Sequence, residues 1–123
     1  MKNFLTYTAI IEAITGLGLM IIPSTVARIL LNSKLEGPVA TLLAMIGGAA
    51  IFSLALGAWF NRSNSHVLLG VRMLMFYNAL VTLILLFGIL KMGVGGLVLW
   101  IVVIFHFAQT VICSNLLRDR KVI

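Results

Sequence analysis

Charged residues are scarce in this chain of 123 residues. They make up only 10% of the sequence, with three acidic and nine basic residues. Soluble domains carry about 25% charged residues, so an ordinary water-exposed surface is excluded. Hydrophobic residues make up 62%, and the mean hydropathy is +1.18. We therefore predict an integral membrane protein with a single domain over residues 1–123.

Cysteine and the motifs of soluble enzymes are almost absent as well. Cys113 is the only cysteine, which excludes a disulfide within the chain and a thiol pair for redox chemistry. The chain has no phosphate loop, no G-x-S-x-G motif and no C-x-x-C motif. Glu12 and His106 supply too few ligands for a metal site. We therefore predict no cofactor and no metal. We also predict no nucleic-acid partner, because the basic residues sit at the ends of apolar runs, where they meet lipid headgroups.

Four apolar runs are each long enough to cross the hydrocarbon core as a helix, which takes about 20 residues. They cover about residues 4–22, 38–60, 67–90 and 93–117. Helices are required because lipid offers no hydrogen-bond partner to an open backbone. The first run lacks an A-x-A-like cleavage site, so we expect it to be a retained span rather than a signal peptide. The predicted fold is all-α, a four-helix membrane bundle.

The segment between the first two spans is predicted to form a short helix. Ser24 or Thr25 would cap it. Its apolar residues, flanked by Arg28 and Lys34, predict that it lies in the plane of the membrane interface; a plain loop is the alternative. The other two connections are tight, which favours antiparallel packing of successive spans.

The distribution of Lys and Arg predicts the orientation. Four spans place both termini and the 61–66 turn on one side of the membrane. That side carries Lys2, Arg62, Arg118, Arg120 and Lys121, and the other carries Arg28, Lys34 and Lys91. The excess favours cytoplasmic termini in the inner membrane, although five against three leaves a dual orientation open.

Three spans carry polar residues that are costly to place in lipid. An ionisable residue within a span costs about 2.5–3.5 kcal/mol and is a functional-site hypothesis by default. Helical rise places Glu12 and Gln109 about 12 Å from the side of the termini, and Asn78 and His106 about 16 Å. Helical spacing turns these polar faces into the bundle. We predict that the four residues line a ligand pocket in the cytoplasmic half.

Simpler interpretations of the polar residues stay open. Glu12 is equally interpreted as a structural lock, and His106 as a core histidine whose hydrogen bonds are satisfied. Arg72, about 8 Å deep, either reaches back to the headgroups or pairs with Glu12.

The second span is unusually rich in small residues. Small residues spaced by four allow another helix to approach closely. The sequence does not decide whether that helix belongs to this chain or to a second copy, so a homo-oligomer through the second span stays open. The predicted helix-packing residues are Gly16, Gly48, Ser53 and Gly57.

Short sequence motifs occur in all four spans, in a fixed order along the chain. These motifs are Glu12-x-x-x-Gly16 with Pro23, Gly48 with Leu56-Gly57-x-Trp59, Tyr77-Asn78, and Trp100 with His106. With them the chain resembles, over nearly its whole length, small four-span bacterial membrane proteins of the DoxX-like type. Relatives often carry an arginine shortly before the second-span glycine, where this chain has Ala44, Met45 and Ile46. The resemblance implies a four-helix bundle and no particular reaction.

The leading functional prediction is a membrane-embedded protein that binds a small lipophilic or amphipathic molecule. Residues 11–16 are also similar to the first helix of small multidrug resistance transporters, which makes a proton-coupled exporter using Glu12 one alternative. A structural or accessory subunit is another. An enzyme is not favoured but stays open, because one acid and one histidine suffice for acid–base chemistry on a lipid. Membrane lipids are the partners expected in every case.

Overall fold

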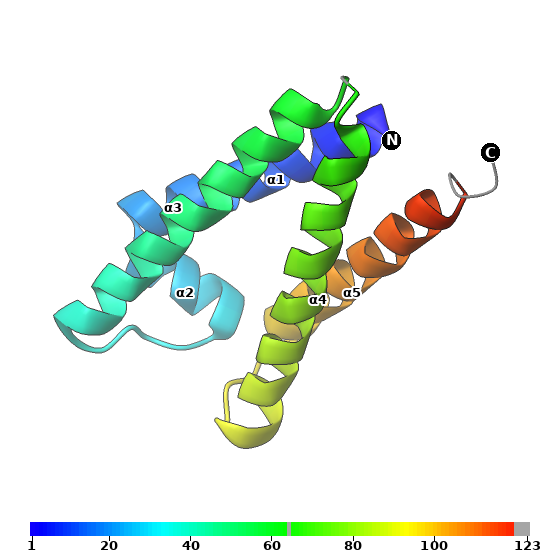
Figure 1. Ribbon diagram of the computed structural model, residues 1–123. Helices are drawn as coiled ribbons and strands as arrows, with labels where there is room; N and C mark the ends of the chain where they lie inside the picture. The colour runs from blue at the N-terminus through cyan, green and yellow to red at the C-terminus, as the bar shows by residue number, and fades with distance from the viewer. Residues whose placement is uncertain (64, 120–123) are drawn as a thin grey trace.

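The structure is a computed structural model that describes residues 1–63 and 65–119. Every element in these two ranges is a helix (Figure 1). They are α1 (Lys2–Ile21), α2 (Pro23–Leu31), α3 (Gly37–Asn61), α4 (Val67–Lys91) and α5 (Leu97–Arg118). The predicted all-α fold, with a short helix between the first two spans, is confirmed. Asn64, Arg120 and Lys121, which entered the predictions of the turn and the orientation, lie outside the described residues.

Four of the described helices are long and apolar enough to cross a bilayer. Their lengths are 20 residues for α1, 25 each for α3 and α4, and 22 for α5. At about 1.5 Å per residue the shortest measures about 30 Å, the thickness of the hydrocarbon core. The start of α1, the α3–α4 turn and the end of α5 lie at one end of the molecule, and α2 lies at the other (Figure 1). This arrangement indicates a multi-pass membrane protein.

Two helix starts differ from the predictions. The α2 helix begins at Pro23 with Ile22 as its N-cap and no capping side-chain hydrogen bond, so neither Ser24 nor Thr25 caps it. Proline suits the first helical turn because its missing N–H would have no partner there. The last helix begins at Leu97 rather than near residue 93, because Gly93 and Gly96 take φ angles of 69° and 141°. Such positive φ angles are incompatible with a right-handed helix.

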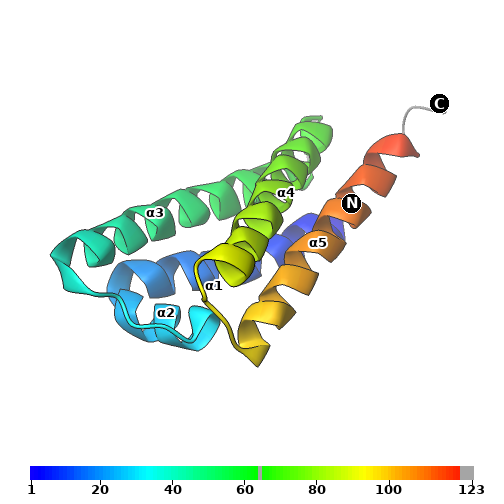
Figure 2. The same ribbon diagram turned by 90° about the horizontal axis from the view of Figure 1, so that it is seen from below.

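The four long helices form two pairs. The α1 helix packs extensively on α3, and α4 packs extensively on α5. The α3 and α4 helices diverge from their shared turn (Figures 1 and 2). In the described residues, no Cα atom of α1 comes within 8 Å of one in α5. The two pairs therefore meet along a seam where side chains have to bridge the helix axes.

The α1–α3 pair is built on a close backbone approach. A Cβ atom added to Gly16 would lie 2.7 Å from the carbonyl oxygen of Gly48, and one added to Gly48 would lie 2.7 Å from the carbonyl oxygen of Gly16. Small residues allow such an approach, and in lipid the resulting van der Waals contact is a main source of helix association. The structure thus places two of the predicted helix-packing residues against each other.

The other two predicted packing residues lie elsewhere. Ser53 is exposed and donates a hydrogen bond of 2.8 Å to the carbonyl of Ala49 in its own helix. A Cβ atom added to Gly57 would meet nothing within 4 Å. Among the described residues, Ser53 and Gly57 therefore show no close helix contact, and their contact with a second copy stays a prediction.

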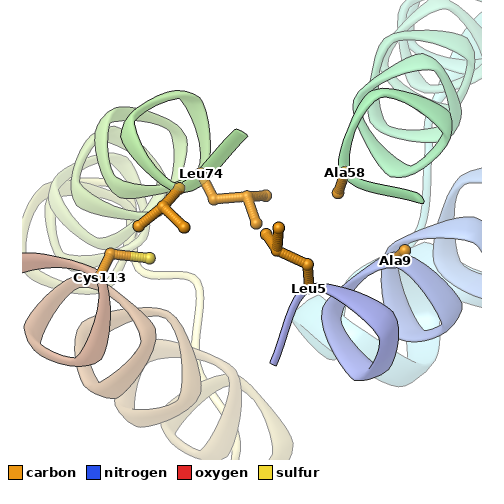
Figure 3. Packing of buried hydrophobic residues seen from close by; sticks show 6 residues of the cluster. Leu5, Ala9, Ala58, Leu74 and Cys113 are labelled. Carbon is orange, nitrogen blue, oxygen red and sulfur yellow. The ribbon is translucent and has the colours of Figure 1, made fainter. Parts of the chain in front are cut away.

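An apolar cluster joins the two pairs near the end of the molecule that holds the α3–α4 turn. It consists of Leu5, Ala9, Ala58, Val71, Leu74 and Cys113. Leu5 of α1 points across the seam toward Leu74 of α4, and Cys113 of α5 lies on the far side of Leu74 (Figure 3). This cluster holds α1 and α3 against α4 and α5.

Candidate functional site

A layer of polar side chains follows the apolar cluster along the seam. Its members are at most 8% exposed and come from three helices. They are Thr8 and Glu12 of α1, Asn78 and Thr82 of α4, and His106 and Gln109 of α5. The four residues predicted to contact a ligand are all buried in this layer.

Thr8 and Gln109 connect the helices whose backbones stay apart. The Thr8 hydroxyl donates a buried hydrogen bond of 2.9 Å to Oε1 of Gln109. A glutamine side chain is long enough to cross the space between α1 and α5, which explains why this link exists without close backbone contact. The bond ties the first and last spans of the protein together.

Asn78 connects α4 with α5 through His106. The Asn78 amide nitrogen donates a 2.7 Å hydrogen bond to the Leu74 carbonyl, which leaves Oδ1 to face the imidazole. His106 Nδ1 lies 2.6 Å from that oxygen. Since a carbonyl oxygen only accepts, Nδ1 carries the proton, and Nε2 is the acceptor of the neutral ring. The asparagine thereby sets the tautomer and the orientation of the histidine.

Glu12 is held more loosely than its neighbours. The Tyr77 hydroxyl donates to its Oε2 atom over 3.4 Å, a long hydrogen bond. The other carboxyl oxygen, Oε1, is buried and has no hydrogen-bond partner among the described residues. A buried polar atom left without a partner costs about 1–3 kcal/mol. Among the described residues, Glu12 Oε1 is therefore the one fully buried side-chain oxygen or nitrogen atom that is left without a hydrogen bond.

Tyr77 borders this layer and was not predicted as a site residue, and neither were Thr8 and Thr82 within the layer. The Tyr77 ring also packs edge-on against His106, with 5.8 Å between ring centroids. Tyr77 is adjacent to Asn78, but the phenol reaches Glu12 only because α1 crosses α4 at this height. A tyrosine next to an intramembrane asparagine was the one available signal.

Arg72 does not join the polar layer. Its side chain is exposed on α4, and among the described residues no ion pair connects it with Glu12. It lines a surface groove together with Arg118 at the end of the α4–α5 pair. The pairing with Glu12 is thus not seen among the described residues, and a reach toward the headgroups stays a prediction.

Replacing Thr8 with valine tests the link between α1 and α5. Valine has nearly the same shape but no donor, so Gln109 Oε1 loses its partner and the free energy of unfolding should fall by about 1 kcal/mol. The measurement is reversible SDS-induced unfolding in bicelles. Thr15→Val is the control, because the Thr15 hydroxyl bonds only to the Ile11 carbonyl of its own helix. Equal losses in the two variants would show that the Thr8 bond does not join the helices.

Comparisons with known proteins add no assignment: no protein-family model, no curated protein and no solved structure matches this chain.

Proposed function

We propose that the protein binds a small amphipathic molecule at the seam between its two helix pairs, with Glu12 as the principal contact. The observation that carries the proposal is the buried Oε1 atom of Glu12, which lacks a partner among the described residues. A ligand with an N–H or O–H group would satisfy this atom and remove its desolvation cost. An apolar tail of the same ligand would lie among side chains that already face lipid.

Three further residues of the layer shape the proposed site. Asn78, His106 and Gln109 are positioned by the hydrogen bonds described above. Pre-organised polar groups lower the ordering cost of binding. Their role in the proposal is to orient the polar end of the ligand while Glu12 accepts its hydrogen bond.

The proposed location is the inner membrane with cytoplasmic termini. This rests on the count of Lys and Arg in the sequence, five on the side of the termini against three on the other side. The polar layer then lies between that surface and the middle of the bilayer. We also keep the proposed relation to DoxX-like membrane proteins, which rests on the sequence elements alone.

The test uses two probes that differ in hydrogen-bond donors. Dodecylamine carries N–H donors, and dodecyltrimethylammonium has the same chain and charge but none. With the protein in nanodiscs, dodecylamine at about 100 times its Kd should raise the unfolding temperature by roughly 10 °C. Dodecyltrimethylammonium should have a much smaller effect.

Glu12→Ala should abolish the temperature shift caused by dodecylamine. Glu36→Ala is the matched control, because it removes a carboxylate that is exposed just before α3. His106→Ala should weaken the shift. A full shift in the Glu12 variant would refute the proposal.

A second candidate function is a structural subunit in which the layer only locks helices together. The hydrogen bonds that join Thr8 to Gln109 and His106 to Asn78 favour it, since most of the layer is already paired within the chain. It predicts that Glu12→Gln and His106→Asn change stability while no probe shifts the unfolding temperature.

A proton-coupled exporter would give a different result. Dodecyltrimethylammonium would then also shift the unfolding temperature in a way that depends on Glu12, and cells would gain a Glu12-dependent resistance to quaternary ammonium compounds.

A further inference from the structure

A second site lies at the surface, away from the polar layer. A groove of about 560 Å³ runs between α4 and α5 at the end that holds the α3–α4 turn. Its lining combines two cations, one hydroxyl and three apolar side chains: Arg72, Arg118, Ser114, Met75, Phe76 and Leu117. Such a mixture of cationic and apolar side chains suits the boundary between lipid headgroups and acyl chains.

In the part of the chain that the structure describes, the two arginines pair with no anion. The sequence has only three acidic residues, Glu12, Glu36 and Asp119. Glu12 is buried in α1, and Glu36 precedes α3 at the opposite end of the molecule. Asp119 adjoins Arg118 in sequence, but in the described residues neither arginine forms an ion pair. Two guanidinium groups therefore line one groove, and neither forms an ion pair with another described residue.

The depth of the groove matches the two parts of a phospholipid. Arg118 is the last residue of α5, and Arg72 lies five residues after the start of α4, which is about 8 Å along the helix. Both guanidinium groups can thus reach the level of the headgroups. Phe76 lies one helical turn deeper than Arg72 and is 63% exposed, at the level of acyl chains.

We propose that this groove is a binding site for an anionic phospholipid. The guanidinium groups of Arg72 and Arg118 bind the phosphate, with the Ser114 hydroxyl as an additional donor. The planar fork of arginine suits phosphate oxygens, which it binds in a bidentate manner. The acyl chains lie along the apolar side chains, and basic pockets between spans are known to bind anionic headgroups in this way. The proposal is independent of any ligand at Glu12.

Native mass spectrometry of the delipidated protein tests this site. The full chain in detergent is titrated with palmitoyl-oleoyl phosphatidylglycerol and, separately, with the corresponding phosphatidylcholine. The wild type should bind the first phosphatidylglycerol at least tenfold more tightly than phosphatidylcholine. The R72Q/R118Q variant should bind the two lipids equally. Both replaced side chains are exposed, so we expect the variant to fold, and the single variants R72Q and R118Q should each show a partial loss.

The matched control is the R28Q/K91Q variant. It has the same net charge as R72Q/R118Q, but its replaced residues are exposed at the other end of the molecule, on α2 and at the end of α4. It should keep the full preference for phosphatidylglycerol. A preference that persists in R72Q/R118Q, or one that is lost equally in R28Q/K91Q, overturns the proposal. Displacement of the bound lipid by an equal concentration of inorganic phosphate would also overturn it, because the phosphate alone would then be the ligand.

Discussion

Gly16→Val should lower the free energy of unfolding by at least about 3 kcal/mol, the largest loss expected from any single substitution considered for this protein. A Cβ atom at this position would lie 2.7 Å from both the Gly48 carbonyl oxygen and the Phe52 nitrogen. Both are backbone atoms, so no side-chain rotation relieves the overlap. The α1 and α3 helices would have to separate, and overpacking a tight contact typically costs about 1–3 kcal/mol before any such separation. The contact with α3 is the most extensive contact that α1 makes, so separation of the two helices removes most of the packing of α1.

Gly47→Val provides the control for this substitution. Gly47 precedes Gly48 in the same helix, and a Cβ atom added there would meet nothing within 4 Å. The replacement adds the same side chain and changes helix propensity in the same direction, yet it should leave unfolding in bicelles nearly unchanged. If the two variants lost similar stability, the close approach of α1 and α3 would not be what holds them together.

The sequence predicts the helices well because membrane spans obey a simple constraint. Lipid requires about 20 consecutive apolar residues in a helix, and the predicted bounds of the first three spans lie within two residues of α1, α3 and α4. The predicted start of the fourth span lies four residues before the start of α5, whereas its predicted end lies within one residue of the end of α5. Gly93 and Gly96 are compatible with an apolar helix in composition, and only their positive φ angles exclude it.

The pairing of the helices was harder to predict. Tight turns suggest that neighbours in sequence are neighbours in space, which holds for α4 with α5. The α3 helix packs instead on α1, because Gly48 faces Gly16. A helix rich in small residues offers several faces on which another helix can pack closely, and sequence alone does not show which face makes the contact. The stripe through Ser53 was therefore as plausible as the face of Gly48.

The polar layer was predictable in position but not in its bonds. Helical rise places Glu12, Asn78 and His106 at similar depths, and helical spacing turns them inward. Which of them pair depends on side-chain reach across the seam. Arg72 shows this limit, since its long side chain allows either a partner in the bundle or a headgroup, and only the azimuth of α4 decides.

Leu74→Ala is expected to cause the second-largest loss, about 2 kcal/mol. Leu74 is fully buried in the apolar cluster that joins the two helix pairs. In lipid the unfolded reference is itself apolar, so little transfer energy is lost, and the cost comes from the cavity and its missing contacts. The substitution leaves the Leu74 carbonyl in place, so the hydrogen bond from Asn78 survives and the loss reports packing alone.

The Leu80→Ala variant is the control, because Leu80 lies on the same helix but is 58% exposed. It should lose less than about 0.5 kcal/mol, measured by SDS-induced unfolding in bicelles. A double-mutant cycle with Leu5→Ala then decides what holds the seam. Leu5 points at Leu74 across it (Figure 3), so the two losses should be non-additive by at least about 0.5 kcal/mol. Such coupling would mean that the apolar cluster joins the helix pairs, which leaves the polar layer beneath it available for a ligand. Additive losses would mean that the contact between Leu5 and Leu74 does not join the helix pairs.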